Sequence, residues 1–286
     1  MTTSRTITYP LGQWLWVWEV SASGGIDAII AQAKATKMTG LIIKSFDGDA
    51  VWTQFSDSAN AVKAAGLRLG AWGYVYNTNL AQTAVAAKAA ITAGAEFVVF
   101  DAEIEFETPQ GAADAKSLGG YARALMPDVT IGYTTFALPD DHTQFPYAQF
   151  SQWCDFAMPQ VYWADAGMQP QAMLAASVQQ LSGFGKRIFP VGQAYTPATA
   201  TEIAEFGAGC AEHWIEGVSW WDAQSSTPEL QAAVAQVEVY TPKPPAPVKY
   251  QVVTGWFDGT AQGCPAADEA AAKIKALGWN SWVQKV

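Results

Sequence analysis

The sequence has few of the residues that build metal centres, disulfide frameworks or nucleic-acid interfaces. Its 286 residues include only two histidines and three widely spaced cysteines (Cys154, Cys210 and Cys264) without a CxxC pair. Neither a zinc site, a disulfide framework nor a Ser-His-Asp triad is therefore expected. Lys and Arg number 16 against 26 Asp and Glu, and the formal net charge of −10 argues against nucleic acid as a partner. We expect no metal and no other cofactor.

Long apolar runs are missing as well. No stretch approaches the roughly 18 apolar residues of a membrane span, so we expect no membrane insertion. The first 20 residues lack a signal-peptide pattern, because their apolar run is short and ends on Glu19. The expectation is a monomer that, if it acts outside a cell, leaves by another route.

Short apolar runs do alternate with alanine-rich helical stretches along most of the chain. The predicted strands are 14–20, 40–46, 68–76, 96–106, 129–138, 155–163, 187–195 and 217–223. Several helical stretches end in Gly, which favours a C-terminal cap there. Alternation of this kind predicts an α/β fold with a parallel sheet. Eight units in about 230 residues match a (β/α)8 TIM barrel, which we place over residues 10–240.

The C-terminal part of the sequence has a different composition. Residues 241–249, TPKPPAPVK, are too rich in proline for a helix or a central strand and predict an extended linker. Residues 250–286 have a strand–helix–strand pattern and predict a small β-α-β accessory module. This pattern resembles half of a SPOR-like module, a family that binds peptidoglycan glycan chains. A stabilising appendage on the barrel is the alternative.

The most informative segment is FVVFDAEIEFE at residues 97–107. Strand side chains alternate between faces, so Asp101, Glu103 and Glu105 are predicted to point into the same space. Like charges this close raise one another's pKa, and one carboxyl tends to keep its proton. A protonated acid beside an ionised one is what glycosidic bond cleavage requires. A solvated strand end is the alternative, above all for Glu105 and Glu107.

In a TIM barrel, chemistry takes place at the mouth, which is the end formed by the carboxyl termini of the strands and the loops that follow them. Nearly every predicted strand ends there in a polar or aromatic side chain. Besides the three carboxylates, the candidates for substrate binding are Glu19, Lys44, Tyr74, Tyr133, Gln160, Tyr162, Gln193, Trp220, Trp221 and Asp222. Carboxylates and carboxamides hydrogen-bond to hydroxyl groups, and aromatic rings provide flat faces for sugar rings. The predicted partner is therefore a glycan.

A barrel with this mouth resembles the glycoside hydrolase superfamily, and most closely the family-25 lysozymes of phages and bacteria. Asp101 and Glu103 match the Asp-x-Glu that ends strand four in that family. Glu19 matches an acid on strand one, where the family usually has Asp. Tyr133 and Asp222 match a Tyr on strand five and an acid near strand eight.

A second resemblance is to the chitinase-type family-18 barrels. The sequence MPQVYW on strand six is similar to their MxY pattern, and DAEIE has their alternating acids on strand four. Both resemblances imply that Glu103 is the catalytic general acid. The first implies that Asp101 tunes the pKa of Glu103, and the second that Asp101 and Tyr162 orient a substrate N-acetyl group as internal nucleophile.

The resemblance to lysozymes implies a hydrolase that cleaves a peptidoglycan-type glycan of N-acetylated amino sugars. A muramidase-like phage endolysin fits, held in the cytoplasm until lysis or acting at the cell wall, with the C-terminal module as a wall-binding aid. A chitinase-type family-18 hydrolase is one alternative. A non-catalytic carbohydrate-binding barrel is another, favoured by the large number of acids and by Glu19 where Asp is usual.

Overall fold

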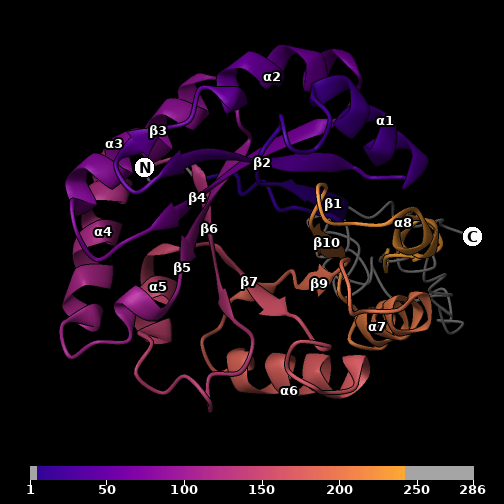
Figure 1. Ribbon diagram of the computed structural model, residues 1–286. Coiled ribbons are helices and arrows are strands. Elements are labelled where there is room, and N and C mark those ends of the chain that lie inside the picture. The colour runs from indigo at the N-terminus through magenta and orange to yellow at the C-terminus, as the bar shows by residue number, and fades with distance from the viewer. Residues whose placement is uncertain (1–4, 242–286) are drawn as a thin grey trace, which may run out of the picture. The chain divides into compact units, whose positions relative to one another are not determined.

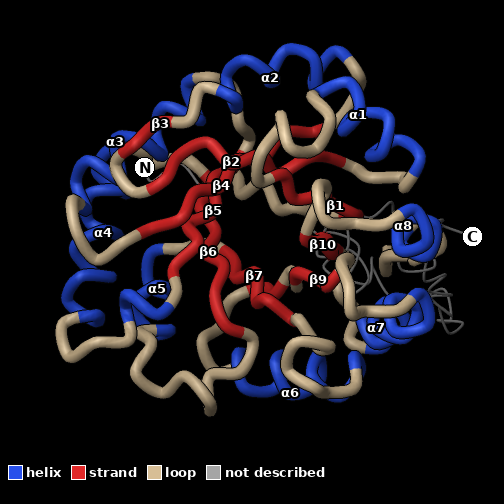
Figure 2. The backbone as a smooth tube through the Cα atoms, in the orientation of Figure 1, coloured by secondary structure: helices blue, strands red, loops and turns tan. Residues whose placement is uncertain are grey.

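A computed structural model describes residues 5–241 and confirms the predicted TIM barrel. The barrel strands are β1 (Gly12–Val17), β2 (Gly40–Asp47), β4 (Arg68–Val75), β5 (Phe97–Ala102), β6 (Thr130–Phe136), β7 (Phe156–Val161), β9 (Val191–Gln193) and β10 (Gly217–Trp221). Each pairs in parallel with the next, and β1 pairs with both β2 and β10, which closes the barrel. Figures 1 and 2 show the strands at the centre of the molecule.

Helices form an outer ring around the strands (Figure 2). They are α1 (Ile26–Ala35), α2 (Gln54–Ala64), α3 (Leu80–Thr92), α4 (Gly111–Leu125), α5 (Tyr147–Trp153), α6 (Pro170–Ser182), α7 (Ala200–Glu212) and α8 (Pro228–Val234). Within the described residues, none of these helices has the length and apolar character needed to span a bilayer.

Two short strands lie beside the barrel strands. β3 (Ala50–Val51) folds back antiparallel on β2, and β8 (Arg187–Ile188) pairs with the start of β7. The predicted single strand at 187–195 is therefore wrong, because the chain is interrupted at Phe189–Pro190 before β9 begins. Proline has no backbone N–H to donate to a neighbouring strand, which accounts for the break.

The predicted strand at 96–106 is too long. β5 ends at Ala102, and a 3₁₀ turn, η1 (Ile104–Phe106), follows directly. Phe106 is fully buried and packs edge-to-face on Phe150 of α5, with ring centroids 5.2 Å apart. Burial of this ring outside the barrel draws the chain out of the sheet. Strand alternation therefore ends before Glu105.

Large aromatic side chains fill the barrel interior because neighbouring strands place glycine beside them. The interior cluster consists of Trp14, Trp16, Ile42, Trp72, Phe97, Val99, Phe156, Met158, Phe189 and Val191. A Cβ at Gly70 would lie 2.4 Å from the Phe97 ring, and one at Gly132 would lie 2.3 Å from the Phe156 ring. Substituting either glycine would therefore displace an interior phenylalanine.

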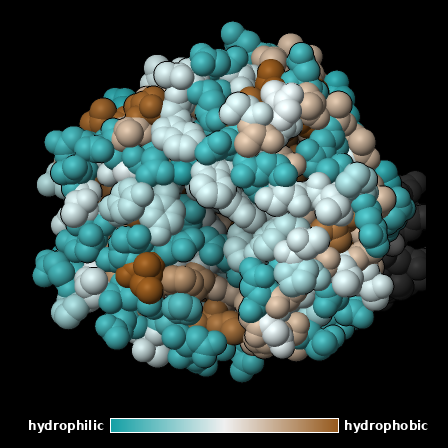
Figure 3. Space-filling view, viewed as in Figure 1, coloured by the Kyte–Doolittle hydropathy of each residue, from teal (hydrophilic) through white to brown (hydrophobic). Residues whose placement is uncertain are grey.

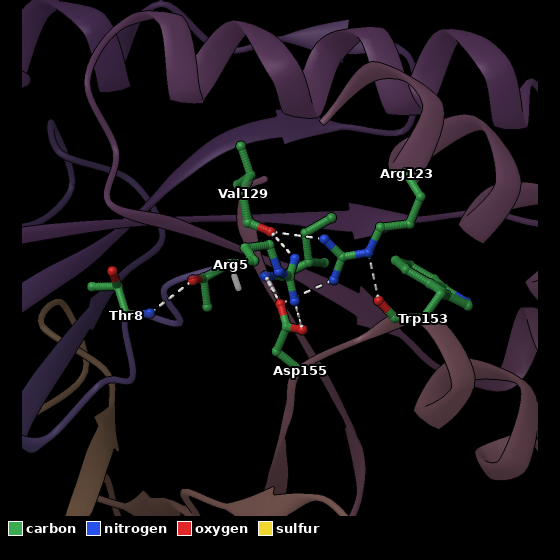
Figure 4. Close-up of polar contacts among 8 residues, drawn as sticks. Arg5, Thr8, Arg123, Val129, Trp153 and Asp155 are labelled. Atoms are coloured by element: carbon green, nitrogen blue, oxygen red, sulfur yellow. Dashed lines mark hydrogen bonds and ion pairs between the residues drawn. The ribbon is translucent and has the colours of Figure 1, made fainter. Parts of the chain in front are cut away.

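The N-terminal segment closes the end of the barrel opposite the mouth. Tyr9 packs on Phe189, with ring centroids 5.6 Å apart, and the Thr8 amide donates to Thr130 Oγ1 at 2.8 Å. Arg5 reaches further and forms an ion pair with Asp155, which also pairs with Arg123 at 2.9 Å (Figure 4). The carboxylate of Asp155 thus joins the N-terminal segment to α4.

The predicted linker at 241–249, apart from Thr241, and the predicted module at 250–286 lie outside the described residues. Both remain predictions.

Replacing Asp155 with Asn should destabilise the barrel, because its side chain is only 8% exposed and the change removes the negative charge between two guanidinium groups. We expect a loss of about 2–4 kcal/mol in the free energy of unfolding, measured by urea denaturation. The exposed Asp128→Asn is the matched control and should change it by less than about 0.5 kcal/mol. Equal stability of the two variants would contradict this role for Asp155.

Candidate active site

A pair of carboxyl groups lies at the mouth, at the end of β5. Asp101 is the penultimate residue of β5 and is only 5% exposed. Its side chain shares a hydrogen bond with that of Glu103, the first residue after the strand. The Gln160 amide of β7 donates to both carboxyls, with Nε2 at 3.1 Å from Asp101 Oδ1 and 2.8 Å from Glu103 Oε1. We call Asp101 and Glu103 the carboxyl pair.

The surroundings of Asp101 favour its protonated form. Burial raises the pKa of Asp101 well above its usual range, and the charge and hydrogen bond of Glu103 raise it further. A protonated carboxyl can donate a hydrogen bond to an ionised one, whereas two ionised carboxylates cannot hydrogen-bond to each other. The raised pKa favours Asp101 as the protonated member of the pair. The sequence predicted a proton held between these residues, with Glu103 as the group whose pKa is raised.

Glu105 approaches the same space from the η1 turn. Its Oε2 accepts a hydrogen bond of 2.7 Å from the Tyr74 hydroxyl of β4. Burial, this hydrogen bond and the three nearby carboxylates all raise the pKa of Tyr74 far above its usual value. The hydroxyl therefore remains a donor at any working pH. The sequence predicted that Glu105 faces the mouth, and the turn brings it there in place of the predicted strand.

Lys44, at the inner face of β2, is the cation next to these carboxylates. Its ammonium is 2.6 Å from Asp47 Oδ2 and lies over the rings of Trp52, Trp72 and Trp18. Its positive charge lowers the pKa of Asp101, against the effect of burial.

Aromatic side chains line the same side of the mouth. Trp221, the last residue of β10, is half-buried against Trp72, Trp16 and Trp18, with ring centroids 5.4, 5.8 and 6.2 Å apart. Trp18 is 40% exposed, and so is available to a ligand. Tyr76 is also exposed at the rim and donates to Asp47 Oδ1 at 3.0 Å. The face seen in Figure 3 is mostly hydrophilic to neutral and is hollowed near its centre.

A second polar group lies at the ends of β7, β9 and β10. Gln193 is fully buried, donates to Asp165 Oδ1 at 3.1 Å and accepts from the Ala164 amide. The Tyr195 hydroxyl also donates to Asp165, and its ring packs edge-to-face on Tyr162 at 5.8 Å. Sequence reasoning missed Asp165, because it lies in a loop where no periodicity marks it.

Tyr162 and Asp222 face one another across this group. Burial raises the pKa of the Tyr162 hydroxyl, and the negative charges of Asp101, Glu103 and Asp222 add to the effect. Burial likewise raises the pKa of Asp222, whose Oδ1 accepts from the Ser225 amide at 3.1 Å. The peptide bond between Trp221 and Asp222 is cis.

Three predicted site residues do not join this arrangement. Tyr133 points to the outer face of β6, where it stacks on Phe150 and its hydroxyl bonds to Ser151. Trp220 points to the outer face of β10 and donates to Gln13. Glu19 is exposed in the loop after β1. Side chains of a strand alternate between its two faces. The inward positions next to Tyr133 and Trp220 are those of Gly132, Thr134, Ser219 and Trp221. Tyr133 and Trp220 therefore point away from the mouth.

No cluster of three or more His, Cys, Asp or Glu side chains with metal-binding geometry occurs among residues 5–241. Sequence reasoning also missed the three rings around Lys44, which belong to Trp18, Trp52 and Trp72. No sequence pattern distinguishes them, because Trp is frequent in both the core and the rim of this barrel.

Solved structures with the same barrel include enzymes named for action on glycans. The protein is similar to a chitinase from Chromobacterium violaceum, with 11% identity, a TM-score of 0.57, and coverage of 79% of this chain and 98% of that one. It is similar to the spore cortex-lytic enzyme SleL of Bacillus cereus, with 13% identity, a TM-score of 0.60, and coverage of 81% and 75%. A family-18 N-acetylglucosaminidase from Paenibacillus barengoltzii gives 12% identity, a TM-score of 0.60, and coverage of 80% and 100%.

At these identities the likeness shows a shared TIM-barrel fold. A search with protein-family models gave no match, and a search of the curated proteins gave none either.

The raised pKa of Asp101 predicts a pH-dependent stability difference between the protein and its Asp101→Asn variant. Folding raises this pKa, so the stabilisation from the proton is complete below the unfolded pKa of about 3.9 and is lost as the pH rises through the folded pKa. Asn keeps a neutral hydrogen-bonding group there. We expect the variant to gain stability relative to the parent as the pH rises from about 4 through the folded pKa of Asp101, measured by urea denaturation.

Asp128→Asn, on the surface, is the control and should show no such trend. A stability difference for Asp101→Asn that is constant with pH, or that falls as pH rises, would contradict the assignment of the proton to Asp101.

Proposed function

We propose that the protein is a glycoside hydrolase that cleaves a cell-wall glycan of N-acetylated amino sugars. The observation that carries the proposal is the carboxyl pair at the mouth, where Gln160 donates to both Asp101 and Glu103 and burial raises the pKa of Asp101. Cleavage of a glycosidic bond needs a proton donor for the leaving oxygen and a negative charge close to the developing oxocarbenium ion. The pair supplies a proton, and the adjacent carboxylates supply negative charge.

In the proposed reaction, Glu103 gives the proton to the glycosidic oxygen. Asp101 holds the proton in the free protein and passes it to Glu103 along their hydrogen bond. As the proton moves onto the leaving oxygen, the bond between the anomeric carbon and that oxygen breaks, and its electron pair stays on the oxygen. Water then attacks the anomeric carbon, and its proton returns to the carboxyl pair.

The substrate N-acetyl group is the proposed internal nucleophile. As the leaving oxygen departs, the acetamide carbonyl oxygen bonds to the anomeric carbon and forms a cyclic oxazolinium intermediate, while Tyr162 donates a hydrogen bond to the acetamide group. The later attack of water on the anomeric carbon breaks the bond between that carbon and the carbonyl oxygen and restores the N-acetyl group. This assignment is supported by the raised pKa of Tyr162, which keeps its hydroxyl protonated near the carboxyl pair. The half-buried ring of Trp221 and the exposed ring of Trp18 offer flat faces to pyranose rings.

The names of the similar solved structures support an amino-sugar substrate, because they include a chitinase, an N-acetylglucosaminidase and a spore cortex-lytic enzyme. Within this class we propose lysozyme-like action on peptidoglycan by a monomer. The proposed setting is that of a phage endolysin, which reaches the wall at lysis, with residues 250–286 aiding attachment.

Replacing Glu103 with Gln should lower the rate of glycan cleavage by about 10²–10⁴-fold, because Gln cannot transfer a proton. Binding of the glycan should change little. The measurement is turbidity loss of a cell-wall suspension, beside release of reducing ends from chitin oligosaccharides. Glu107→Gln is the matched control and should retain activity, because Glu107 pairs with His142 at 2.9 Å and Gln can still accept that hydrogen bond.

Glu105→Gln separates the two candidate donors. If Glu103→Gln stays active while Glu105→Gln loses activity, Glu105 is the donor and the assignment is wrong. A parent protein that binds these glycans and cleaves none of them would instead identify a carbohydrate-binding barrel.

A further inference from the structure

Lys44 is a buried cation that contacts three aromatic rings and one carboxylate. The residue is 4% exposed, and the inward positions of β2 before it, Gly40 and Ile42, are glycine and apolar. The distance from Nζ to the ring centroid is 4.3 Å for Trp52, 5.1 Å for Trp72 and 5.6 Å for Trp18. We call these three rings the tryptophan cage. Indole faces attract an ammonium group, and more strongly when water is excluded.

Taking an ammonium out of water is costly unless a counter-charge compensates it. Asp47 provides one such charge, at 2.6 Å from Nζ. Asp47 is itself shared, because Tyr76 donates to its other oxygen. The strand register places Asp47, Tyr74 and Asp101 side by side on β2, β4 and β5. The next negative charges across the mouth from Lys44 are therefore those at the end of β5.

The side chains that surround Asp101 come from several strands and from the η1 turn, and they differ in charge. Glu103 and Glu105 bring negative charge from the end of β5 and from η1. Tyr74 of β4 and Tyr162, directly after β7, bring neutral hydroxyls, and Gln160 of β7 brings an amide. Lys44 of β2 is the one positive charge among the groups that act on Asp101 in the described residues.

We propose that Lys44 is a positioning residue, whose caged ammonium stabilises the carboxyl pair in the doubly ionised form that exists after Glu103 has given up its proton. This inference rests on the proposed function. The pair carries one negative charge before the transfer and two after it. A fixed cation nearby favours the second state over the first, and therefore favours the transfer. The tryptophan cage keeps the ammonium in place without neutralising it.

Direct binding of an anionic group of the substrate is the competing role for Lys44. Its low exposure and its ion pair with Asp47 oppose this role, because a ligand would have to displace both a carboxylate and a ring. The two roles predict different kinetics. A positioning residue affects kcat and the pH profile, whereas a binding residue affects KM for anionic glycans.

The test is Lys44→Met in the full-length protein, since Met fills similar volume within the cage and has no charge. The first readout needs no activity. Carboxyl ¹³C NMR of aspartate-labelled protein, with Asp101→Asn for assignment, measures the pKa of Asp101. We expect Lys44→Met to raise this pKa, and the exposed Lys88→Met, which removes the same charge from α3, to leave it unchanged.

The second readout is the pH profile of glycan cleavage. With Lys44→Met, kcat should fall by about tenfold or more, while KM for a neutral glycan should stay within about threefold. The limb of the pH–rate profile that reports the carboxyl pair should move to higher pH. If the parent cleaves no glycan, the proposed function fails, while the NMR titration still decides whether Lys44 acts on Asp101.

Asp47→Asn keeps the test valid if Lys44→Met does not fold. It leaves the ammonium less neutralised, so the pKa of Asp101 should move in the opposite direction and fall. An unchanged pKa of Asp101 in the folded variants would overturn the proposal. A raised KM confined to anionic glycans, with kcat unchanged, would also overturn it and assign Lys44 to substrate binding.

Discussion

The burial of Asp101 beside Glu103 is the constraint on which the rest of the mouth depends. A carboxyl group that is 5% exposed is unfavourable as an ion, so the surroundings must either neutralise it or satisfy its charge. Both happen in this protein. The raised pKa of Asp101 favours its neutral form, and one amide from β7 donates to both Asp101 and Glu103. Asp101 and Glu103 both come from the end of β5, and the parallel pairing of β5, β6 and β7 brings Gln160 to them.

The packed interior of the barrel explains the burial of Asp101. Beneath it lie Val99 and Phe97 of the same strand, and the interior is otherwise filled by Trp, Phe, Ile, Val and Met side chains. Trp14, Trp16 and Trp72 serve this packing, and Trp163 and Trp220 are equally buried in the layer between the strands and the helices. Trp18, Trp52 and Trp221 remain partly accessible at the mouth, where they can contact a ligand.

Much of this arrangement was predictable from the sequence. Alternating strands and helices identified the barrel, and strand parity placed Asp101 on the inner face beyond Val99. Strand parity also excludes Tyr133 and Trp220 from the mouth. This step requires that the inward positions of β6 and β10 are already known. The turn at Ile104–Phe106 depends on burial of Phe106 against a helix far along the chain, which no local pattern encodes. Asp165 and Trp52 lie in loops, where position is determined by tertiary contacts alone.

The central claim is that Glu103 is placed to protonate a glycosidic oxygen at the mouth. A crystal structure of the Glu103→Gln variant with a bound N-acetylglucosamine oligosaccharide tests it most directly. The account predicts a glycosidic oxygen within about 3 Å of the side-chain amide at position 103, with a pyranose ring over Trp221. A glycan bound with that oxygen nearest Glu105 would contradict the claim, and so would a glycan bound only at the opposite end of the barrel, where Trp214 is 74% exposed.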